Sequence, residues 1–541
     1  MTRDFGPRAT TTDASPQRHG RDQVFHYLLE ARARQTPEKP CLAMGSRTLS
    51  YGEVDAEANR WAHGLSGHGV RKGDRVLLMI PSGLEHVLIW LGLCKLGALM
   101  VPVNEAYMGA MLKNQVNDSG AEFAIIAAHH VARWRDLHDD LPLLKEIAVF
   151  PELAGAAQDS APWTWSSASD LRAEDMTPLP PVVDYSDPMA IFYTSGTTGP
   201  SKGVVYTYAQ AHACAAVPAA WCTQDDVFYM FLPMFHVGLS QIFGLVLIAG
   251  ATMAVREKFS ASEFWNDVRR YRATSTILLS TMPNFLLSKP ALANDADHTL
   301  RKAIVIPLPA ELPRFTSRFG VEVATFYNMT EVSTPLCTDG FNLANGTSCG
   351  RPRPGVEARL VDERDEPVPD GSVGELVLRA DNAWEFSLGY WRNPEKTNES
   401  RRNLWFHTGD AFRRDGDGNF YFVDRLKDAI RRRGENISSF EVEAEIDAHP
   451  AVLESAAVAV PSANGEDEIK AAVALRPNAS LTPPELHAYL SERLPVYMVP
   501  HYIDIRRSEL PKTPTGKIVK AALREAGVAG VWAAEQRKPQ R

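Results

Sequence analysis

The sequence predicts an α/β protein in which a large, layered N-terminal domain precedes a smaller α+β domain. The chain has 541 residues, more than one hydrophobic core normally holds, so at least two domains are expected. Short apolar runs alternate with helix-spaced segments through most of the chain, a pattern typical of doubly wound sheets covered by helices. Between residues 350 and 379, short strand-like runs separated by Pro and Gly predict a small β-barrel instead.

The alternation begins with an expected helix over 24–34, and Ser50 with Glu53 forms a capping box that starts a second helix. A second capping box, Ser82 with Glu85, is expected just before the apolar run 86–103. Lys95 and Pro102 interrupt that run, so a buried helix entering a strand explains it better than a membrane span. Further strands are expected at 74–80, 122–126, 189–192, 226–231, 275–279, 302–306 and 321–327, with a helix over 239–248.

The expected domain organisation has five parts. Residues 1–22 are polar and carry no apolar core, which indicates a disordered leader rather than a secretory signal. An N-terminal domain over 23–424 and a hinge at 425–427 follow. A mobile C-terminal domain over 428–530 and a disordered tail over 531–541 complete the chain.

Bulk composition excludes several classes of protein. With 45% hydrophobic and 23% charged residues, the chain is ordinary for a soluble globular protein. A net charge of −9 argues against nucleic acid as the main partner. The six cysteines form no Cys-x-x-Cys pair, so neither a metal cluster nor a disulfide framework is expected. These features fit a cytoplasmic protein without membrane insertion. A monomer or a homodimer is expected, but the sequence does not decide between them.

The segment 193–204, YTSGTTGPSKGV, is the most distinctive stretch of the chain and follows the expected buried strand 189–192. Its glycines allow sharp turns with bare N–H groups, its hydroxyls add donors, and Lys202 adds a positive charge, a combination that suits a polyphosphate. It is not a Walker A loop, because Lys202 is followed by Gly203. A flexible Gly/Thr loop remains the alternative on composition alone.

Four later motifs follow this loop: YNMTE at 327–331, WFHTGD at 405–410, VDRLKDAIRRRGENI at 423–437 and PKTPTGK at 511–517. Together with the loop they resemble, in the same order, the motifs of the adenylate-forming superfamily of acyl-CoA synthetases, peptide-synthetase adenylation domains and luciferases. The resemblance spans about residues 22–527 and is strongest to the acid–CoA ligases of the crotonobetaine/carnitine type.

The resemblance implies roles for individual residues. Lys202 and the loop would hold the ATP phosphates, Glu331 would hold Mg²⁺, and Lys517 would bridge the α-phosphate and the acid. Asp410 and Arg425 would hold the ribose. The catalytic residues expected are Lys202, Thr330, Glu331 and Lys517. The residues expected around ATP or AMP are Thr194, Ser195, Gly196, Thr197, Thr198, Gly199, Lys202, Asn328, Met329, Thr330, Asp410, Phe422, Arg425 and Lys517.

The resemblance also assigns a second half-reaction. Lys427 would be the pivot of the hinge, and Gly434, Glu435 and Asn436 would face the pantetheine of CoA. His236, in the motif FLPMFH at 231–236, would gate the acyl pocket. Amino-acid-activating relatives carry an Asp beside the Phe of this motif; its absence argues against an α-amino acid substrate.

Two departures from the family pattern concern the acid. Asn328 stands where the family has Gly, at a position where adenine or the acyl group would pack. AIVIPL at 303–308 replaces a Gly-Gly-Ala-Pro stretch, and its bulkier side chains are expected to narrow the adenine–acyl pocket. The expected function is ATP-dependent activation of a small or aromatic acid as acyl-AMP, with release of pyrophosphate and then transfer to CoA. One alternative is an acceptor other than CoA, an amine or a carrier thiol, including nitrite activation to diazotise an aryl amine. A catalytically silent nucleotide-binding scaffold is another.

Overall fold

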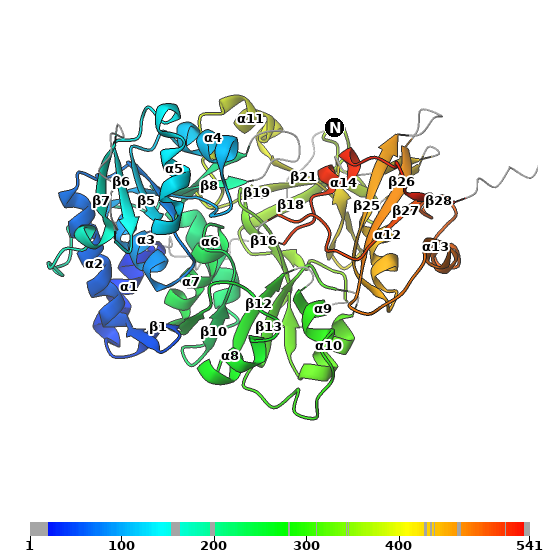
Figure 1. Cartoon of the computed structure of the whole chain (residues 1–541), viewed down its shortest axis with the longest axis horizontal. Coiled ribbons are helices and arrows are strands. Elements are labelled where there is room, and N and C mark those ends of the chain that lie inside the picture. Colours follow the sequence, from blue (N-terminus) through cyan, green and yellow to red (C-terminus); the bar gives the residue numbers. More distant parts are fainter. Residues whose placement is uncertain are drawn as a thin grey trace, which may run out of the picture.

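The computed structural model describes residues 20–152, 163–194, 201–279, 282–309, 311–341, 343, 346–426, 430–432, 435–437, 439–461, 467–513 and 516–534, with backbone only at 21, 431, 432, 435 and 436. Two large, mostly parallel sheets form the N-terminal part of the molecule (Figure 1). A barrel-like unit and the C-terminal unit follow them along the chain.

The first large sheet has eight strands. In spatial order these are β20 (Gly389–Tyr390), β9 (Lys202–Thr207), β8 (Pro188–Thr194), β4 (Leu99–Pro102), β3 (Arg75–Met79), β5 (Phe123–Ala127), β6 (Glu146–Phe150) and β7 (Thr164–Ser167). The strands from β8 to β7 are parallel, whereas β9 and β20 pair antiparallel at one edge. This edge is where the chain makes its most distinctive loop, between β8 and β9.

The second large sheet has seven strands. In spatial order these are β14 (Glu322–Ala324), β13 (Lys302–Ile306), β12 (Ser275–Leu279), β10 (Val227–Met230), β11 (Thr252–Val255), β1 (Pro40–Met44) and β2 (Arg47–Ser50). The predicted strand 321–327 is wrong as a single element. It divides into β14 and β15 (Phe326–Met329), which belong to different sheets.

Helices fill the space between and around the two sheets. One continuous core joins strands of both sheets to α1 (Phe25–Gln35), α2 (Tyr51–Gly67), α3 (Leu84–Leu96), α6 (Tyr208–Ala219) and α7 (Gly238–Ala249). A separate core on the other face of the eight-stranded sheet contains α4 (Gly109–Ser119) and α5 (Val131–Arg135). Helices α8 (Phe264–Tyr271), α9 (Met282–Leu287) and α10 (Leu312–Phe319) complete the seven-stranded subdomain.

The start of α2 follows its local sequence signal, whereas the start of α3 does not. The capping box predicted for α2 is confirmed, because Ser50 and Glu53 bond each other's backbone. The capping box predicted for α3 is wrong: Gly83 precedes the helix without a side-chain cap. The Ser82 hydroxyl instead accepts a hydrogen bond from Met234 N, 3.0 Å away. A hydrogen bond from a distant segment therefore takes the place of the capping bond that was expected at the start of α3.

The apolar run 86–103 forms α3 and then β4, as predicted. Lys95 is buried in this run, and its ammonium lies 2.8 Å from both Glu30 and Asp55. Two carboxylates thus compensate the buried charge. Among the described residues, no helix combines the length and the apolar character needed to cross a bilayer.

The predicted small barrel consists of two sheets around one core. Its four-stranded sheet contains β18 (Val356–Val361), β19 (Val373–Ala380), β21 (Phe406–Arg414) and β22 (Phe420–Arg425). Its three-stranded sheet contains β15, β16 (Ser333–Cys337) and β17 (Arg351–Pro352), and α11 (Pro394–Glu399) precedes β21 along the chain. Residues from both sheets share a single hydrophobic cluster.

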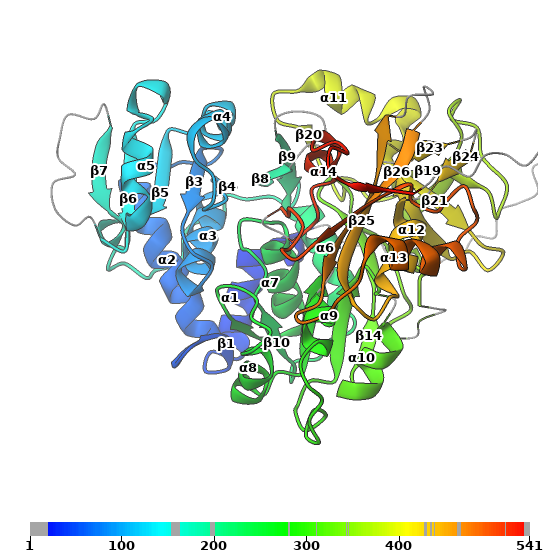
Figure 2. The ribbon, with the colours of Figure 1, turned by 45° about the vertical axis from the view of Figure 1, so that its right-hand side comes forward.

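The C-terminal unit has its own sheet of β25 (Val452–Pro461), β26 (Asp467–Leu475), β27 (Tyr502–Arg506) and β28 (Trp532–Ala533). The hairpin β23 (Ile430–Arg432) and β24 (Glu435–Ile437) and helices α12 (Ser439–Asp447), α13 (Pro483–Ser491) and α14 (Lys520–Glu525) surround it. Figures 1 and 2 show this unit beside β19 and β21 and far from β7. Because β28 pairs with β27, the sheet continues past the domain end predicted at residue 530.

Candidate active site

The predicted phosphate loop connects two paired strands. In β8 and β9, Thr194 lies opposite Lys202, and the Thr194 hydroxyl donates to the Lys202 carbonyl over 3.4 Å. The loop residues Ser195, Gly196, Thr197, Thr198 and Gly199 lie outside the described part of the chain. The pairing nevertheless fixes both ends of the loop at the carboxyl end of β8, where ligands bind in open α/β sheets.

Tyr390 connects this hairpin to Glu331. Strand β20 pairs Tyr390 with Val204 of β9, and Lys202 Nζ lies 5.4 Å from the centroid of the Tyr390 ring. The Tyr390 hydroxyl donates a 2.9 Å hydrogen bond to Glu331 Oε1. One tyrosine therefore contacts both the lysine and the carboxylate of the predicted phosphate and metal sites.

Glu331 is a buried carboxylate in the turn that follows β15. Burial raises the pKa of Glu331, and the hydrogen bond from Tyr390 opposes this shift. The preceding carbonyl, of Thr330, accepts a 2.8 Å hydrogen bond from Gln210 Nε2 on α6, which holds the turn. A buried carboxylate oxygen is a ligand that Mg²⁺ accepts, and a bound cation would favour its charged form.

Asp410 and Arg425 lie opposite each other on β21 and β22. Asp410 is 4% exposed; its Oδ2 accepts a 2.6 Å hydrogen bond from the Tyr327 hydroxyl, and its Oδ1 lies 3.5 Å from Arg425 Nε. Burial raises the pKa of Asp410, whereas the Arg425 charge and the Tyr327 hydrogen bond lower it. Nearby on β22, Phe422 packs edge-to-face on Phe412 at 5.5 Å.

Lys517 brings the C-terminal unit into the same site. Its backbone is held by Thr513, which donates N–H to the Lys517 carbonyl over 2.6 Å and accepts from Lys517 N at its hydroxyl over 3.1 Å. Burial and then the Arg425 charge lower the pKa of Lys517, and the negative charges of Asp410 and Glu331 raise it. Its ammonium is thus within electrostatic reach of groups that the N-terminal part supplies.

His236 lies in the turn between β10 and α7. Burial, followed by the charge of Lys517, lowers the pKa of His236 to about 4, so the imidazole is neutral at pH 7. Both His236 and Lys517 keep accessible surface although burial is the largest influence on each pKa. His236 and Lys517 are therefore close enough for the charge of Lys517 to act on the imidazole.

Asn328, the first departure from the family pattern, joins β15 to α6 and α7. Its Nδ2 lies 3.3 Å from Gln241 Oε1 and 3.5 Å from Cys214 Sγ, and Gln241 Nε2 donates to Thr334 Oγ1 over 3.1 Å. Asn328 Oδ1 is buried and has no hydrogen-bond partner among the described residues. The neighbouring Met329 packs into the barrel core.

The second departure, at 303–308, lies only partly in the protein core. Ala303, Ile304 and Val305 are buried in the core as part of β13, so their side chains cannot narrow a ligand pocket. Ile306 and Leu308, at the carboxyl end of the strand, are only partly buried.

The chain matches the family described as AMP-binding enzyme over residues 29–391 and the AMP-binding enzyme C-terminal domain over 441–517. It belongs to the AMP-binding enzyme family. It is 33% identical over 490 residues to the crotonobetaine/carnitine–CoA ligase of Salmonella paratyphi C, covering 88% of this chain and 93% of the relative. Against the Citrobacter koseri protein of the same name, identity is 32% over 486 residues, with the same coverage of 88% and 93%.

Solved structures agree with this AMP-binding assignment. The anthranilate CoA ligase AuaEII in complex with anthranoyl-AMP superposes with a TM-score of 0.85 at 25% identity, covering 94% of this chain and 97% of that one. A benzoate CoA ligase from Burkholderia xenovorans LB400 gives 0.81 at 26% identity, covering 93% and 99%. The comparisons confirm the predicted superfamily and fold, and they agree with the predicted enzyme class, an acid–CoA ligase.

The predicted hinge and CoA-facing segment of this AMP-binding enzyme lie largely outside the described residues. Lys427 and Gly434 lie outside the described residues, and only the backbone of Glu435 and Asn436, in β24, is described. The roles given to them remain predictions. Near them, Asp424 of β22 accepts two 2.6 Å hydrogen bonds from Ser439, one from its N–H and one from its hydroxyl.

Sequence reasoning gave no role to three residues that organise the site of this AMP-binding enzyme: Tyr327, Tyr390 and Gln210. Tyr327 bonds Asp410, Tyr390 bonds Glu331, and Gln210 holds the carbonyl of Thr330. Only the position of the two tyrosines in the sequence could have drawn attention to them. Tyr327 begins the motif 327–331, and Tyr390 stands beside Trp391. Both tyrosines resemble ordinary strand residues until their partners are known.

Proposed function

We propose that this AMP-binding enzyme activates a small or aromatic carboxylic acid with ATP as an acyl adenylate and then transfers the acyl group to CoA. The observation that carries this proposal is Lys517 of the C-terminal unit, whose charge acts on Asp410, Glu331 and His236 of the N-terminal part. The names of the relatives, ligases of crotonobetaine/carnitine, benzoate and anthranilate, support the CoA acceptor and the acid class.

In the first half-reaction, a carboxylate oxygen of the acid attacks the α-phosphorus of ATP. A new P–O bond forms, the bond to the β-phosphate oxygen breaks, and pyrophosphate leaves. Two anions must approach each other, so the site has to supply positive charge where they meet. Lys517 would supply positive charge to the α-phosphate and the carboxylate. Lys202 would supply positive charge to the leaving phosphates.

Glu331 would hold Mg²⁺, which supplies charge neutralisation to the phosphates when it is bound. The protein orients this carboxylate through Tyr390, whose hydroxyl bonds one of its two oxygens. Asp410 is oriented in the same way by Tyr327. A short, fixed carboxylate can accept hydrogen bonds from both ribose hydroxyls, so Asp410 and Arg425 would hold the sugar, with Phe422 and Met329 nearby.

In the second half-reaction, the CoA thiolate attacks the carbonyl carbon of the adenylate, a thioester forms, and AMP leaves. If Lys517 serves adenylation, as proposed, a different face of the C-terminal domain must serve the thiol. We assign the domain movement to a pivot at Lys427, between domains over 23–424 and 428–530. Gly434, Glu435 and Asn436 would then face the pantetheine.

The acid pocket is assigned to His236 and to the Asn328–Gln241 pair. His236 is neutral and partly accessible, and Asn328 fills volume that glycine would leave free. Both features favour a compact or flat acid over a long acyl chain. We expect the reaction in the cytoplasm, by a monomer or a homodimer that needs neither nucleic acid nor membrane insertion.

ATP–pyrophosphate exchange across a panel of small, aromatic and long-chain acids, with and without CoA, tests the proposal. Exchange with a compact acid, together with a thioester seen by mass spectrometry when CoA is added, is the expected result. Exchange without thioester would favour an amine or a carrier thiol as acceptor. No exchange with any acid would contradict the proposal and leave a nucleotide-binding scaffold.

A further inference from the structure

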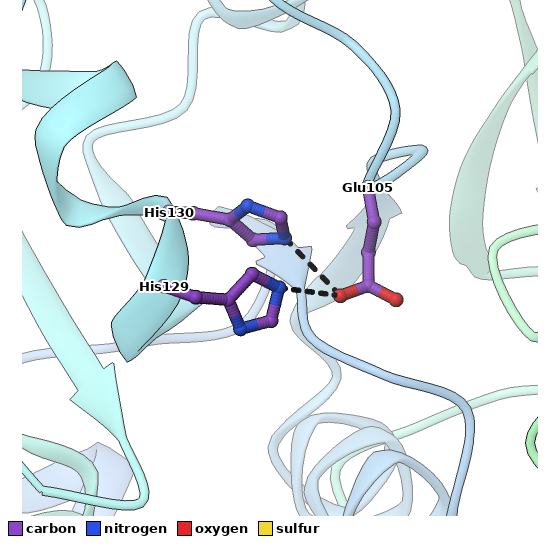
Figure 3. A group of neighbouring side chains, drawn as sticks. All are labelled: Glu105, His129 and His130. Carbon is purple, nitrogen blue, oxygen red and sulfur yellow. Dashed lines mark hydrogen bonds and ion pairs between the residues drawn. The ribbon is translucent and has the colours of Figure 1, made fainter.

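Three side chains that the proposed reaction does not use converge at the edge of the eight-stranded sheet: Glu105, His129 and His130 (Figure 3). Glu105 follows β4, and the two histidines belong to the 3₁₀ turn Ala128–His130 that directly follows β5. Figure 3 shows both imidazole rings directed at the same carboxylate. The cluster is therefore built by two loops that are distant in sequence.

The position of the cluster in the fold is one at which open α/β sheets bind ligands. Strands β4 and β5 run parallel to β3 on either side of it, so their carboxyl ends meet at one edge. Helix α3, which follows β3, packs in the core on one face of the sheet, and α4 and α5 pack in the core on the other face. Chain segments thus diverge here to opposite faces, which defines a topological switch point.

The distances between the three donor groups match those of a metal coordination shell. Glu105 Oε1 lies 3.1 Å from His130 Nε2 and 3.5 Å from His129 Nε2, and all three donor atoms lie within 4.8 Å of one another. Tetrahedral Zn²⁺ with bonds of about 2.0–2.1 Å separates its ligands by roughly 3.3–3.4 Å. The contact to His129 is too long for a good N–H···O bond, so hydrogen bonding explains only one of the two contacts.

The protein holds this arrangement before any ion binds. Arg133, three residues after His130, donates from Nη1 to the carbonyl of Glu105 and, over 2.9 Å, to that of Tyr107, which ties the two loops together. The His130 side chain is only 3% exposed, whereas that of His129 is 62% exposed. Their ring centroids are 4.0 Å apart. The buried His130 would therefore hold a metal ion from inside the protein, and solvent would reach the ion beside the exposed His129.

We propose that Glu105, His129 and His130 form a binding site for a borderline divalent transition-metal ion such as Zn²⁺. Two imidazoles and one carboxylate are a donor set that zinc accepts, and three protein ligands leave a fourth position for water or a small anion. Imidazole ligands do not suit Mg²⁺, which prefers oxygen, so this site differs in its metal from the one assigned to Glu331. The inference goes beyond the proposed ligase function and does not depend on it.

Metal binding to the full-length chain tests the proposal. The chain is stripped with a chelator, exchanged into chelator-free buffer, and titrated with Zn²⁺ in competition with a chromophoric chelator. Co²⁺ is then used as a spectroscopic probe, because tetrahedral Co²⁺ absorbs visible light far more strongly than octahedral Co²⁺. His129→Ala removes the exposed ligand with little risk to folding, and His138→Ala, which also removes a half-exposed histidine, is the matched control.

We expect one tight Zn²⁺ equivalent and intense Co²⁺ bands in the wild type and in His138→Ala. We expect His129→Ala and Glu105→Gln to bind Zn²⁺ at least roughly tenfold more weakly and to lose the Co²⁺ bands. Circular dichroism confirms that each variant is folded. Equal Zn²⁺ affinity in His129→Ala and the wild type, or weak Co²⁺ binding without tetrahedral bands, would overturn the proposal.

Discussion

The hydroxyl of Tyr390 donates a 2.9 Å hydrogen bond to the buried carboxylate of Glu331, and the same ring lies 5.4 Å from the ammonium of Lys202. The strand that carries Tyr390 adds to the sheet edge beside the phosphate hairpin. A single side chain therefore sets the distance between the groups assigned to the phosphates and to Mg²⁺. This relationship gives the first prediction.

Tyr390→Phe should reduce the rate of adenylation and raise the Mg²⁺ concentration needed for half-maximal activity. A hydrogen bond to a charged group contributes about 1.5–3 kcal/mol, so we expect roughly a 10- to 100-fold loss. ATP–pyrophosphate exchange measured against Mg²⁺ concentration reports both effects. Tyr421→Phe is the control, because it also removes a tyrosine–carboxylate bond, to Asp415, outside the site. An unchanged Mg²⁺ dependence in Tyr390→Phe would refute this role.

Lys517→Ala should abolish adenylation but spare thioester formation from supplied acyl-AMP. Its ammonium acts on Asp410 and Glu331, where the phosphate and the acid must meet. Loss of one preorganised charged donor typically costs about 10²–10³ in rate. The two half-reactions are assayed separately, with Arg507→Ala, an exposed cation of the same unit, as the control. Equal loss in both half-reactions would contradict the assignment.

Asp447→Asn should stabilise the C-terminal unit at pH 7.5 and have little effect near pH 3.5. Burial, opposed by a hydrogen bond from Ser455 and aided by the charges of Glu443 and Glu454, raises the pKa of Asp447 to about 8. The folded state therefore binds more protons than the unfolded state between about pH 4 and pH 8, and stability falls as pH rises through this window. Asparagine keeps the shape and removes the charge.

Thermal unfolding at the two pH values measures this effect. The control is Asp417→Asn, in an exposed turn of the barrel. The expected result is a higher melting temperature for Asp447→Asn than for the wild type at pH 7.5, and a smaller difference at pH 3.5. A difference that is the same at both pH values would mean that the charge of Asp447 is not the cause.

Asn328→Gly should widen the range of acids that the enzyme accepts. The substitution removes the hydrogen bonds to Gln241 and Cys214 and frees the volume of the side chain. One methylene of discrimination in an apolar pocket is worth roughly 10- to 200-fold in kcat/KM, and we expect a change of this order towards bulkier acids. Relative kcat/KM values across the acid panel are the measurement. An unchanged ranking of acids would exclude Asn328 from the pocket.

The residues assigned to the site could be proposed from sequence because they sit in dense local motifs. Lys202 lies in the β8–β9 hairpin, Glu331 in the turn after β15, Asp410 on strand β21, and Lys517 in a loop of the C-terminal unit. These segments are far apart in the chain, and the structure brings them to one region. The tyrosines that orient two of these residues could not be predicted. An aromatic residue in a strand is ordinarily a core residue, and only the tertiary arrangement shows which carboxylate its hydroxyl meets.

Two of the wrong predictions have a common physical origin. Ser82 carries a local capping signal for α3, but its hydroxyl is used by Met234 N from another part of the chain. The run 321–327 reads as one strand, yet Thr325 separates β14 from β15, and its hydroxyl donates to Val305 O over 2.7 Å. Hydrogen-bond partners from distant segments decide how such a helix begins or such a strand divides. A local sequence pattern contains no information about these partners.

Asp424 and Ser439 lie on either side of the segment expected to swivel, and they are joined by two short hydrogen bonds. Lys520 of α14 reaches the same serine and also pairs with Glu443 at 2.8 Å, so the junction is tied to the body of the C-terminal unit. A swing about residue 427 would pull this junction apart. If the proposed swing about residue 427 takes place, these bonds must break, and their strength would slow the change from the adenylate-forming to the thioester-forming arrangement.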